Sequence, residues 1–176
     1  MPPPRIAPPS TFDAAQLEQL AKTRPQPGGR PLNVFATLAH RPELLRRVSA
    51  LGGYFPRHSV LGLRERELVI LRVGTCIDSA YVVGQHRAIA GEALSAEEVA
   101  AALDPASAFV WSPVDAALLA FAEELVAEHT VSDATWSALA LPDDALLELV
   151  VLVGFYAMFG TMTNALAIEV DAPPPA

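Results

Sequence analysis

The spacing of the apolar residues limits the possible folds more than any other feature of this sequence. From Leu32 onward, apolar residues recur three and four positions apart, which is the period of an α-helix. No stretch of useful length alternates between apolar and polar residues as a half-buried β-strand does. The pattern therefore predicts an all-α fold, organised as a single-domain helical bundle of about eight helices.

Proline, glycine and capping residues mark the expected helix boundaries. Pro42 opens one helix that a Gly-Gly pair closes, and Ser95 with Glu98 forms the pattern of a capping box. Asp78 or Ser79 can cap the helix that follows the GTCIDS segment. The expected helices span residues 13–23, 32–38, 42–51, 63–73 and 80–91, followed by segments that begin at Ser95, Ser112, Ser132 and Pro142.

Both ends of the chain are rich in proline, which lacks the amide that regular secondary structure needs. We expect residues 1–31 to form a proline-rich N-terminal extension with one short helix, residues 32–170 to form the helical domain, and residues 171–176 to form a disordered tail. The N-terminus has no apolar core of the kind found in signal peptides. A cytoplasmic location is the expectation that follows.

Composition and charge bear on the partners of the chain. Of its 176 residues, 52% are hydrophobic and 18% are charged. An apolar surplus in so short a chain indicates that some apolar surface is covered by another subunit, so we expect a homo-oligomer. The net charge of −8 argues against nucleic acid and against an anionic membrane as partners.

Cysteine and histidine usage bears on metal binding. The single cysteine, Cys76, excludes an intramolecular disulfide and a cysteine-rich metal site. The four histidines show no two-histidine spacing of the metalloprotease type. We therefore expect no metal site.

Residues 145–168 have the length and apolar character of a membrane span. Glu148 and Asn164 interrupt this segment, no basic residue flanks it, and two acidic residues follow it. These features favour a central helix of a soluble oligomer over a membrane span.

Polar groups capable of proton transfer are concentrated in residues 63–91. If the helices at 63–73 and 80–91 fold back as an antiparallel pair, Glu67 and His86 face each other within a direct or single-water hydrogen bond. Pairing is the least costly way to bury two polar groups among apolar neighbours. The alternative interpretation is a surface glutamate and a core histidine that is satisfied elsewhere.

Residues around this pair also have more than one interpretation. Val82, Val83 and Ser79 share the helix face of His86, whereas Tyr81 points about 140° away at 3.6 residues per turn. Cys76, which precedes this helix, is either a thiol activated by helix N-terminal amides or a small buried apolar residue.

The last helix carries a polar stripe with two possible roles. Tyr156, Gly160, Thr163 and Asn164 fall on one face of it. Such a stripe either lines a pocket or makes polar contacts at a helix–helix seam, and the spacing favours the seam.

Several segments together resemble the carboxymuconolactone decarboxylase and alkylhydroperoxidase-D-like superfamily. The resemblance lies in residues 33–45, 63–74, 80–103 and 115–125 and in Trp136, so it covers roughly residues 32–168. It implies an all-α fold that assembles as a dimer, trimer or hexamer. The superfamily holds decarboxylases, thiol peroxidases and many proteins of unknown activity, so the resemblance is specific for fold and weakly specific for reaction.

The chain departs from the peroxidase branch at the cysteines. That branch has a glutamate, then a Cys-x-x-Cys pair, then a histidine four residues later. Glu67 and His86 match the glutamate and the histidine, whereas the cysteine positions fall on Ser79 and Val82. Many other relatives carry Tyr-Glu-Trp where residues 81–83 read Tyr-Val-Val. Dithiol chemistry is therefore not expected.

The residues and the resemblance together predict a cofactor-free enzyme of lyase or isomerase type that acts by proton transfer on a small organic acid, lactone or cyclic metabolite. His86 would donate or accept the proton, and Glu67 would orient the imidazole ring of His86. Tyr81 would donate a hydrogen bond to the developing oxyanion. The positions expected to contact substrate are Cys76, Ser79, Val82, Val83, Tyr156 and Asn164. One alternative is a non-catalytic oligomeric binding or structural protein, and a less favoured one is a thiol antioxidant that uses Cys76 alone.

Overall fold

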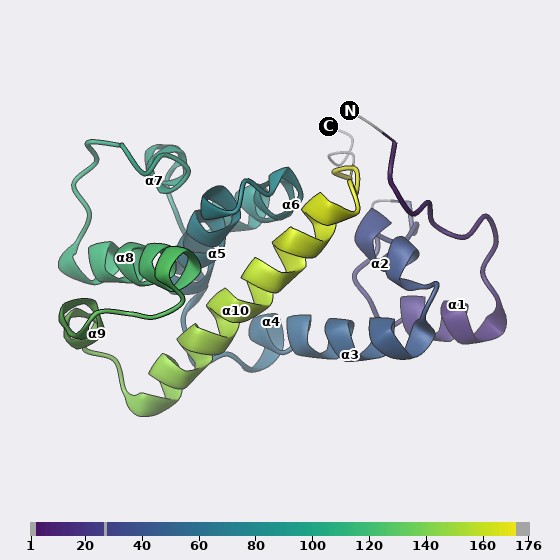
Figure 1. Ribbon diagram of the computed structural model, residues 1–176, viewed down its shortest axis with the longest axis horizontal. Helices are drawn as coiled ribbons and strands as arrows, with labels where there is room; N and C mark the ends of the chain where they lie inside the picture. The colour runs from purple at the N-terminus through teal and green to yellow at the C-terminus, as the bar shows by residue number, and fades with distance from the viewer. Residues whose placement is uncertain (1–2, 27, 172–176) are drawn as a thin grey trace. The chain divides into compact units, whose positions relative to one another are not determined.

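The computed structural model describes residues 3–26 and 28–171, and these residues form ten α-helices (Figure 1). The helices are α1 (Ala14–Leu20), α2 (Asn33–Leu38), α3 (Pro42–Gly52), α4 (Phe55–His58), α5 (Leu63–Cys76), α6 (Ala80–Ala90), α7 (Ala96–Ala102), α8 (Pro113–Glu128), α9 (Asp133–Leu139) and α10 (Asp143–Ala165). Eight of them have seven or more residues. The described residues form no strand. They contain an isolated antiparallel β-bridge between Pro25 and Pro31. The predicted all-α fold is confirmed.

Most predicted helix boundaries lie within three residues of the observed ones, and α5 shows an informative difference. This helix continues through the GTC residues to Cys76 instead of ending at residue 73. The Thr75 hydroxyl donates to the carbonyl oxygen one turn earlier, which keeps the last turn closed. The chain reverses at Asp78, where φ is 51°. Ser79 rather than Asp78 then caps α6 by accepting a hydrogen bond from the Val82 amide.

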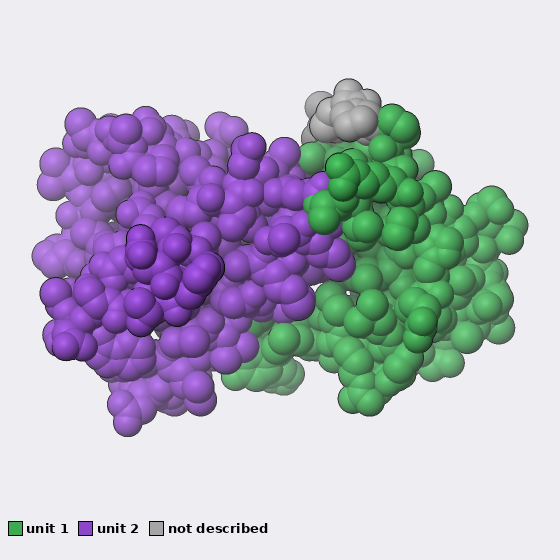
Figure 2. All heavy atoms as spheres, viewed as in Figure 1, with its two compact units in different colours: residues 1–58, 165–176 green, residues 59–164 purple. Residues whose placement is uncertain are grey.

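Contacts divide the chain into two compact units, which Figure 2 shows in separate colours. Unit 1 comprises residues 1–58 and 165–176, and unit 2 comprises residues 59–164. The three parts expected from the sequence remain a prediction. Asp171, at the start of the expected tail, is buried in unit 1, and residues 172–176 lie outside the described residues.

The core of unit 2 forms around α5, which packs against α6, α7 and α8. Leu68 and Leu71 of α5 are fully buried. They belong to an apolar cluster that also contains Ala90, Leu94, Val99, Ala102 and Leu119. Burying several large aliphatic side chains in one cluster is the main stabilising contribution available to such a unit.

Helices α5 and α6 form an antiparallel pair. Gly74, near the end of α5, lies against the beginning of α6, where an added Cβ would be 3.1 Å from methyl groups of Val82 and Val83. The absence of a side chain at Gly74 lets the two helices approach closely at this point. The pairing sets the early turns of α5 beside the last turns of α6.

In unit 1, α3 packs against α1, α2 and α4. The Asp171 carboxylate accepts hydrogen bonds from the side chain of Gln26 at 2.6 Å and from the backbone amide of Asn33 at 2.9 Å. These bonds satisfy a buried carboxylate and join Asp171 to Gln26 and to the first residue of α2.

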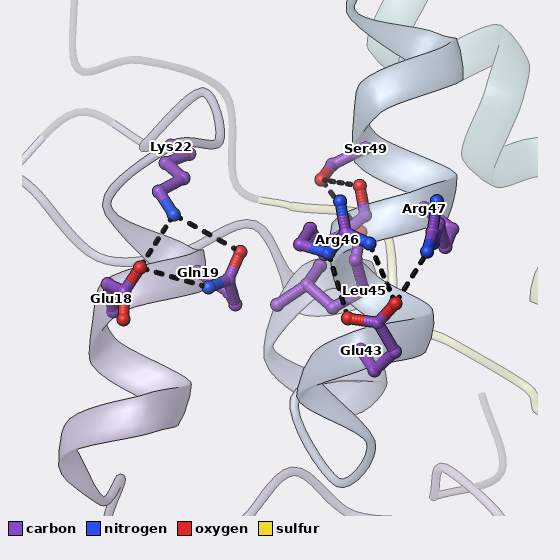
Figure 3. Close-up of polar contacts among 8 residues, drawn as sticks. All are labelled: Glu18, Gln19, Lys22, Glu43, Leu45, Arg46, Arg47 and Ser49. Carbon is purple, nitrogen blue, oxygen red and sulfur yellow. Dashed lines mark hydrogen bonds and ion pairs between the residues drawn. The ribbon is translucent and has the colours of Figure 1, made fainter.

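Exposed ion pairs lie on α3 and at the end of α1 (Figure 3). Lys22 contacts Glu18 at 2.8 Å, and Arg46 and Arg47 contact Glu43 at 2.7 and 2.9 Å. Solvent screens such pairs, so they contribute little to the stability of unit 1.

Helix α10 is the one described helix that is long and apolar enough to cross a membrane by length and composition. Of its most apolar 18-residue window, 56% is buried inside the protein. A substantial part of this helix therefore faces protein.

Candidate functional site

Buried Glu67 and partly buried His86 form a polar pair on the antiparallel helices of unit 2. Oε2 of Glu67, on α5, lies 2.8 Å from Nδ1 of His86, on α6. The side chain of Glu67 is 5% exposed and that of His86 is 15% exposed. The predicted contact between these residues is confirmed, and the alternative of a surface glutamate is wrong.

The contact assigns different roles to the two ring nitrogens of His86. A carboxylate can only accept a hydrogen bond, so Nδ1 carries a hydrogen and donates a hydrogen bond to Oε2 of Glu67. Within the described part of the chain, Nε2 has no hydrogen-bond partner, and it is not among the fully buried polar atoms. Nε2 is therefore the ring atom that remains available to a ligand.

Tyr156 of α10 packs edge-on against the imidazole of His86, with ring centroids 4.9 Å apart and an interplanar angle of 88°. Burial raises the pKa of the Tyr156 hydroxyl well above its usual value, and the charge of Glu67 raises it further. Tyr156 therefore stays neutral at physiological pH. Its ring restricts the orientation of His86 from a third helix.

Tyr81 is buried on α6 but belongs to a different face of the helix from His86. Five residues separate the two positions, which corresponds to about 140° around the helix. Val82 and Val83 lie against Gly74, so the structure places them in the α5–α6 seam. A direct role of these three residues in substrate contact remains a prediction.

The polar stripe of α10 forms a helix–helix seam at its C-terminal end. The hydroxyl oxygens of Ser79 and Thr163 lie 3.2 Å apart, and the Asn164 side-chain amide donates to the carbonyl oxygens of Ile77 and Asp78. The interpretation as a seam is confirmed for these residues. Tyr156, two turns earlier on α10, is the member that reaches His86.

Cys76 differs from both of its sequence interpretations. It is the last residue of α5 rather than a residue at the start of α6, and it is exposed rather than buried. Partial burial of the sulfur raises the pKa of the thiol, and the nearby charge of Glu123 raises it further, while Arg72 opposes them. The amides of α6 do not activate this thiol, because the chain turns between Cys76 and the first residue of α6.

Arg72 and Glu123 are residues whose environment the sequence did not predict. Arg72 is 3% exposed, and its Nη1 lies 3.2 Å from Oε1 of Glu123 on α8. Its Nη2 donates to the carbonyl oxygen of Ala101 at 3.2 Å. One sequence feature could have indicated this ion pair: Arg72 lies within the apolar run of α5, and a buried arginine needs a partner. No group of three or more potential metal ligands occurs among the described residues.

Comparison with known proteins identifies the relatives of this chain. Residues 42–124 match the profile described as the carboxymuconolactone decarboxylase family. No curated protein matches the sequence. Solved structures with the same fold include an uncharacterised peroxidase-related protein from Ralstonia eutropha JMP134, described as an alkylhydroperoxidase AhpD core. It has 24% identity and a TM-score of 0.77, over 97% of this chain and 94% of that one.

Two further structures share the fold. A peroxidase-related protein from Silicibacter sp. TM1040 has 19% identity and a TM-score of 0.73, over 82% of this chain and 78% of that one. The debrominase Bmp8 has 18% identity and a TM-score of 0.79, over 95% of this chain and 92% of that one. A cysteine-to-alanine variant of Bmp8 was solved in complex with 2,3,4-tribromopyrrole. Proteins described as peroxidase-related and as a debrominase thus share this arrangement of helices.

Proposed function

We propose that unit 2 carries a cofactor-free proton-transfer site of lyase or isomerase type, in a chain whose residues 42–124 match the carboxymuconolactone decarboxylase family. The observation that supports this proposal most directly is the 2.8 Å contact between Glu67 and His86. A buried carboxylate that orients an imidazole, with the second ring nitrogen left open, is an arrangement suited to general acid–base catalysis.

His86 moves the proton through Nε2 in this proposal. Glu67 holds the ring through Nδ1 and stabilises the imidazolium that forms when Nε2 accepts a proton from substrate. Tyr156 restricts the plane of the ring from α10. Tyr81 lies about 140° from His86 around α6, so its expected role, as a hydrogen-bond donor to the oxygen on which negative charge develops, depends on the length of its side chain.

The substrate class follows from the reaction. A single base and acid can remove a proton from a carbon beside a carbonyl group, or return one to a carbanion after carbon dioxide leaves. Small organic acids, lactones and related cyclic carbonyl compounds offer such carbons. The reaction needs no change of oxidation state at the protein.

A thiol mechanism has less support in this chain. The relatives include peroxidase-related proteins, but here the two positions of the Cys-x-x-Cys pair hold Ser79 and Val82. The remaining thiol, Cys76, has its pKa raised by partial burial and by Glu123. A thiol that stays protonated near neutral pH is a poor nucleophile.

The test measures hydrogen exchange rather than a single guessed conversion. The full chain is incubated in deuterated water with a panel of lactones, β-keto acids and cyclic ketones, and NMR follows exchange at carbons beside the carbonyl groups. We expect catalysed exchange for at least one class. His86→Gln should lower the rate on the order of 10²–10⁴-fold, and Glu67→Gln on the order of 10–100-fold.

His58→Gln is the matched control, because His58 is an exposed histidine of unit 1. It should leave the exchange rate unchanged. Saturable binding of a panel compound without exchange would instead support the non-catalytic binding protein. Exchange that persists in folded His86→Gln, as judged by circular dichroism, would exclude the proposed role of His86.

A further inference from the structure

Arg66 is a half-buried cation in the first part of α5. Unit 2 has four basic residues, of which Arg64 and Arg72 form ion pairs and Arg87 is exposed. Arg66 forms no ion pair with any residue in the described part of the chain. Its Nη1 donates a hydrogen bond to the carbonyl oxygen of Leu61 at 2.7 Å. A guanidinium has five N–H donors, so most of the donors of Arg66 remain available to a ligand.

The position of Arg66 places its charge next to the candidate site. Arg66 precedes Glu67, so the two side chains leave α5 from neighbouring Cα atoms, about 3.8 Å apart, and point about 100° apart around the helix. Burial raises the pKa of the Tyr156 hydroxyl, the charge of Glu67 raises it further, and the charge of Arg66 opposes both. Because the ring of Tyr156 contacts the imidazole of His86, Arg66 and His86 lie beside the same side chain.

The charges around His86 balance when a proton is removed from a carbon beside a carbonyl group. As Nε2 of His86 takes the proton, the electrons of the broken C–H bond form a carbon–carbon double bond, and the carbonyl π electrons move to the oxygen. The imidazolium that forms is paired with Glu67. The negative oxygen needs a partner of its own among these largely buried side chains, and Arg66 is the cation next to them.

We propose that Arg66 is a catalytic residue of this site, and that its guanidinium binds the substrate oxygen on which negative charge develops. The inference rests on the proton-transfer function proposed above. The planar guanidinium donates in a fixed direction, which suits an oxygen that must be held in one place. Because the charge appears only as the proton leaves, Arg66 acts on turnover more than on substrate affinity.

Exchange kinetics in deuterated water test this role, with the carbonyl compound that wild type exchanges fastest. Arg66→Gln should lower kcat on the order of 10²–10³-fold, the usual loss for one oxyanion donor, and should change KM by less than about three-fold. Arg66→Lys keeps the charge without the planar fork and should recover at least about ten-fold of the lost kcat. Arg87→Gln is the matched control, because it removes the same charge from an exposed position next to His86. It should leave kcat and KM unchanged.

Binding of 4-nitrophenolate measures the same contact without turnover. This anion mimics an enolate, because its negative oxygen is conjugated with a flat, unsaturated carbon skeleton. At pH 8, calorimetry should show that wild type and Arg87→Gln bind it at least about ten-fold more tightly than Arg66→Gln does. If circular dichroism shows that Arg66→Gln has lost helix content, Arg66→Met, which keeps an apolar stem, replaces it in both measurements.

The two measurements separate failure of this inference from failure of the proposed function. Equal kcat in wild type and Arg66→Gln, or a loss confined to KM, would overturn the role of Arg66 and leave that of His86 intact. Absence of exchange by wild type would overturn the proton-transfer function, and phenolate binding would then decide whether Arg66 binds an anionic oxygen. Equal phenolate binding by wild type and Arg66→Gln, including no binding by either, would overturn the inference as well.

Discussion

Arg64 is the residue through which three helices of unit 2 are joined. From α5, its Nη2 donates to Oε1 of Glu98 on α7 at 2.6 Å and to Oδ2 of Asp115 on α8 at 2.9 Å. The hydrogen bond from Arg64 is the largest cause that lowers the pKa of Glu98 to about 2. Bonds from Ser95 in the capping box lower it further.

This contact predicts a specific acid sensitivity. A carboxyl group whose pKa is lowered on folding stabilises the folded state above its unfolded pKa of about 4.3, and that contribution disappears as the pH falls toward about 2. We expect Glu98→Gln to lower the free energy of unfolding at pH 7 by about 1 kcal/mol. The difference from wild type should shrink between about pH 4.5 and pH 2, as measured by thermal denaturation. A difference that stays constant with pH would exclude this linkage.

At the same scale, Cys76 offers a direct measure of local electrostatics. Its thiol pKa is raised first by partial burial and then by the charge of Glu123, so little thiolate forms at pH 8. Glu123→Gln removes a negative charge and leaves Arg72 without its ion-pair partner. Both changes lower the thiol pKa, so alkylation of Cys76 by iodoacetamide at pH 8 should become several-fold faster. The exposed Glu128→Gln serves as control, and equal rates in all three proteins would contradict this assignment.

Among the elements, the start of α6 and the end of α10 pack at an unusually short distance. An added Cβ at Gly160 would lie 2.3 Å from Cδ1 of Ile77 and 3.1 Å from Cβ of Ser79. This close approach lets the Ser79 and Thr163 hydroxyls meet. It holds α6, which carries His86, against α10, which carries Tyr156.

We therefore expect Gly160→Ala to destabilise the protein by about 1–2 kcal/mol, despite the better helix propensity of alanine. Ile77→Val removes the Cδ1 atom that the new methyl group would meet. In that background, Gly160→Ala should cost less than it does alone, as measured by urea unfolding of the two single variants and the double variant. Strict additivity of the two substitutions would show that this contact does not limit the approach of the helices.

Over the whole molecule, charge is divided unequally between the two units. Residues 59–164 contain 4 basic and 15 acidic residues, a net charge of −11, whereas the rest of the chain contains 8 basic and 5 acidic residues, a net charge of +3. The acidic surplus of unit 2 makes its own surface repulsive at low ionic strength. Dissolved salt screens this repulsion, and at an ionic strength of 0.1 M charges more than about 10 Å apart are largely screened from one another.

The unequal charge predicts stabilisation by salt. Raising NaCl from 10 to about 150 mM at pH 7 should increase the midpoint of thermal unfolding by about 2–4 °C, which corresponds to roughly 1 kcal/mol. Scanning calorimetry at one fixed protein concentration measures this change, and an equal osmolarity of glycerol is the control for effects other than screening. A midpoint that falls with NaCl would mean that ion pairs outweigh the repulsion.

Local rules account for the parts of the structure that were predicted correctly. Helical periodicity identifies the main elements, and the Ser95–Glu98 capping box forms as its spacing indicates, because both depend on hydrogen bonds and packing within one or two turns. The Glu67–His86 contact was also predictable. Two helices joined by a short turn bring residues at matching distances from that turn together, so the spacing along the chain sets the partner.

Tertiary packing decided the features that spacing along the chain leaves open. Tyr156 reaches His86 across 70 positions of sequence, and the exposure of Cys76 depends on which helices cover the end of α5. The exposed face of α10 was also left open by the sequence. The apolar run identifies a helix, but apolar residues occur on all sides of the helix axis, so the run does not show which side is exposed. The sequence by itself thus determined which residues form helices and which polar groups meet across a tight hairpin. Only the packing of distant helices decided which faces are buried, because that choice depends on contacts between segments that no local hydrogen bond connects.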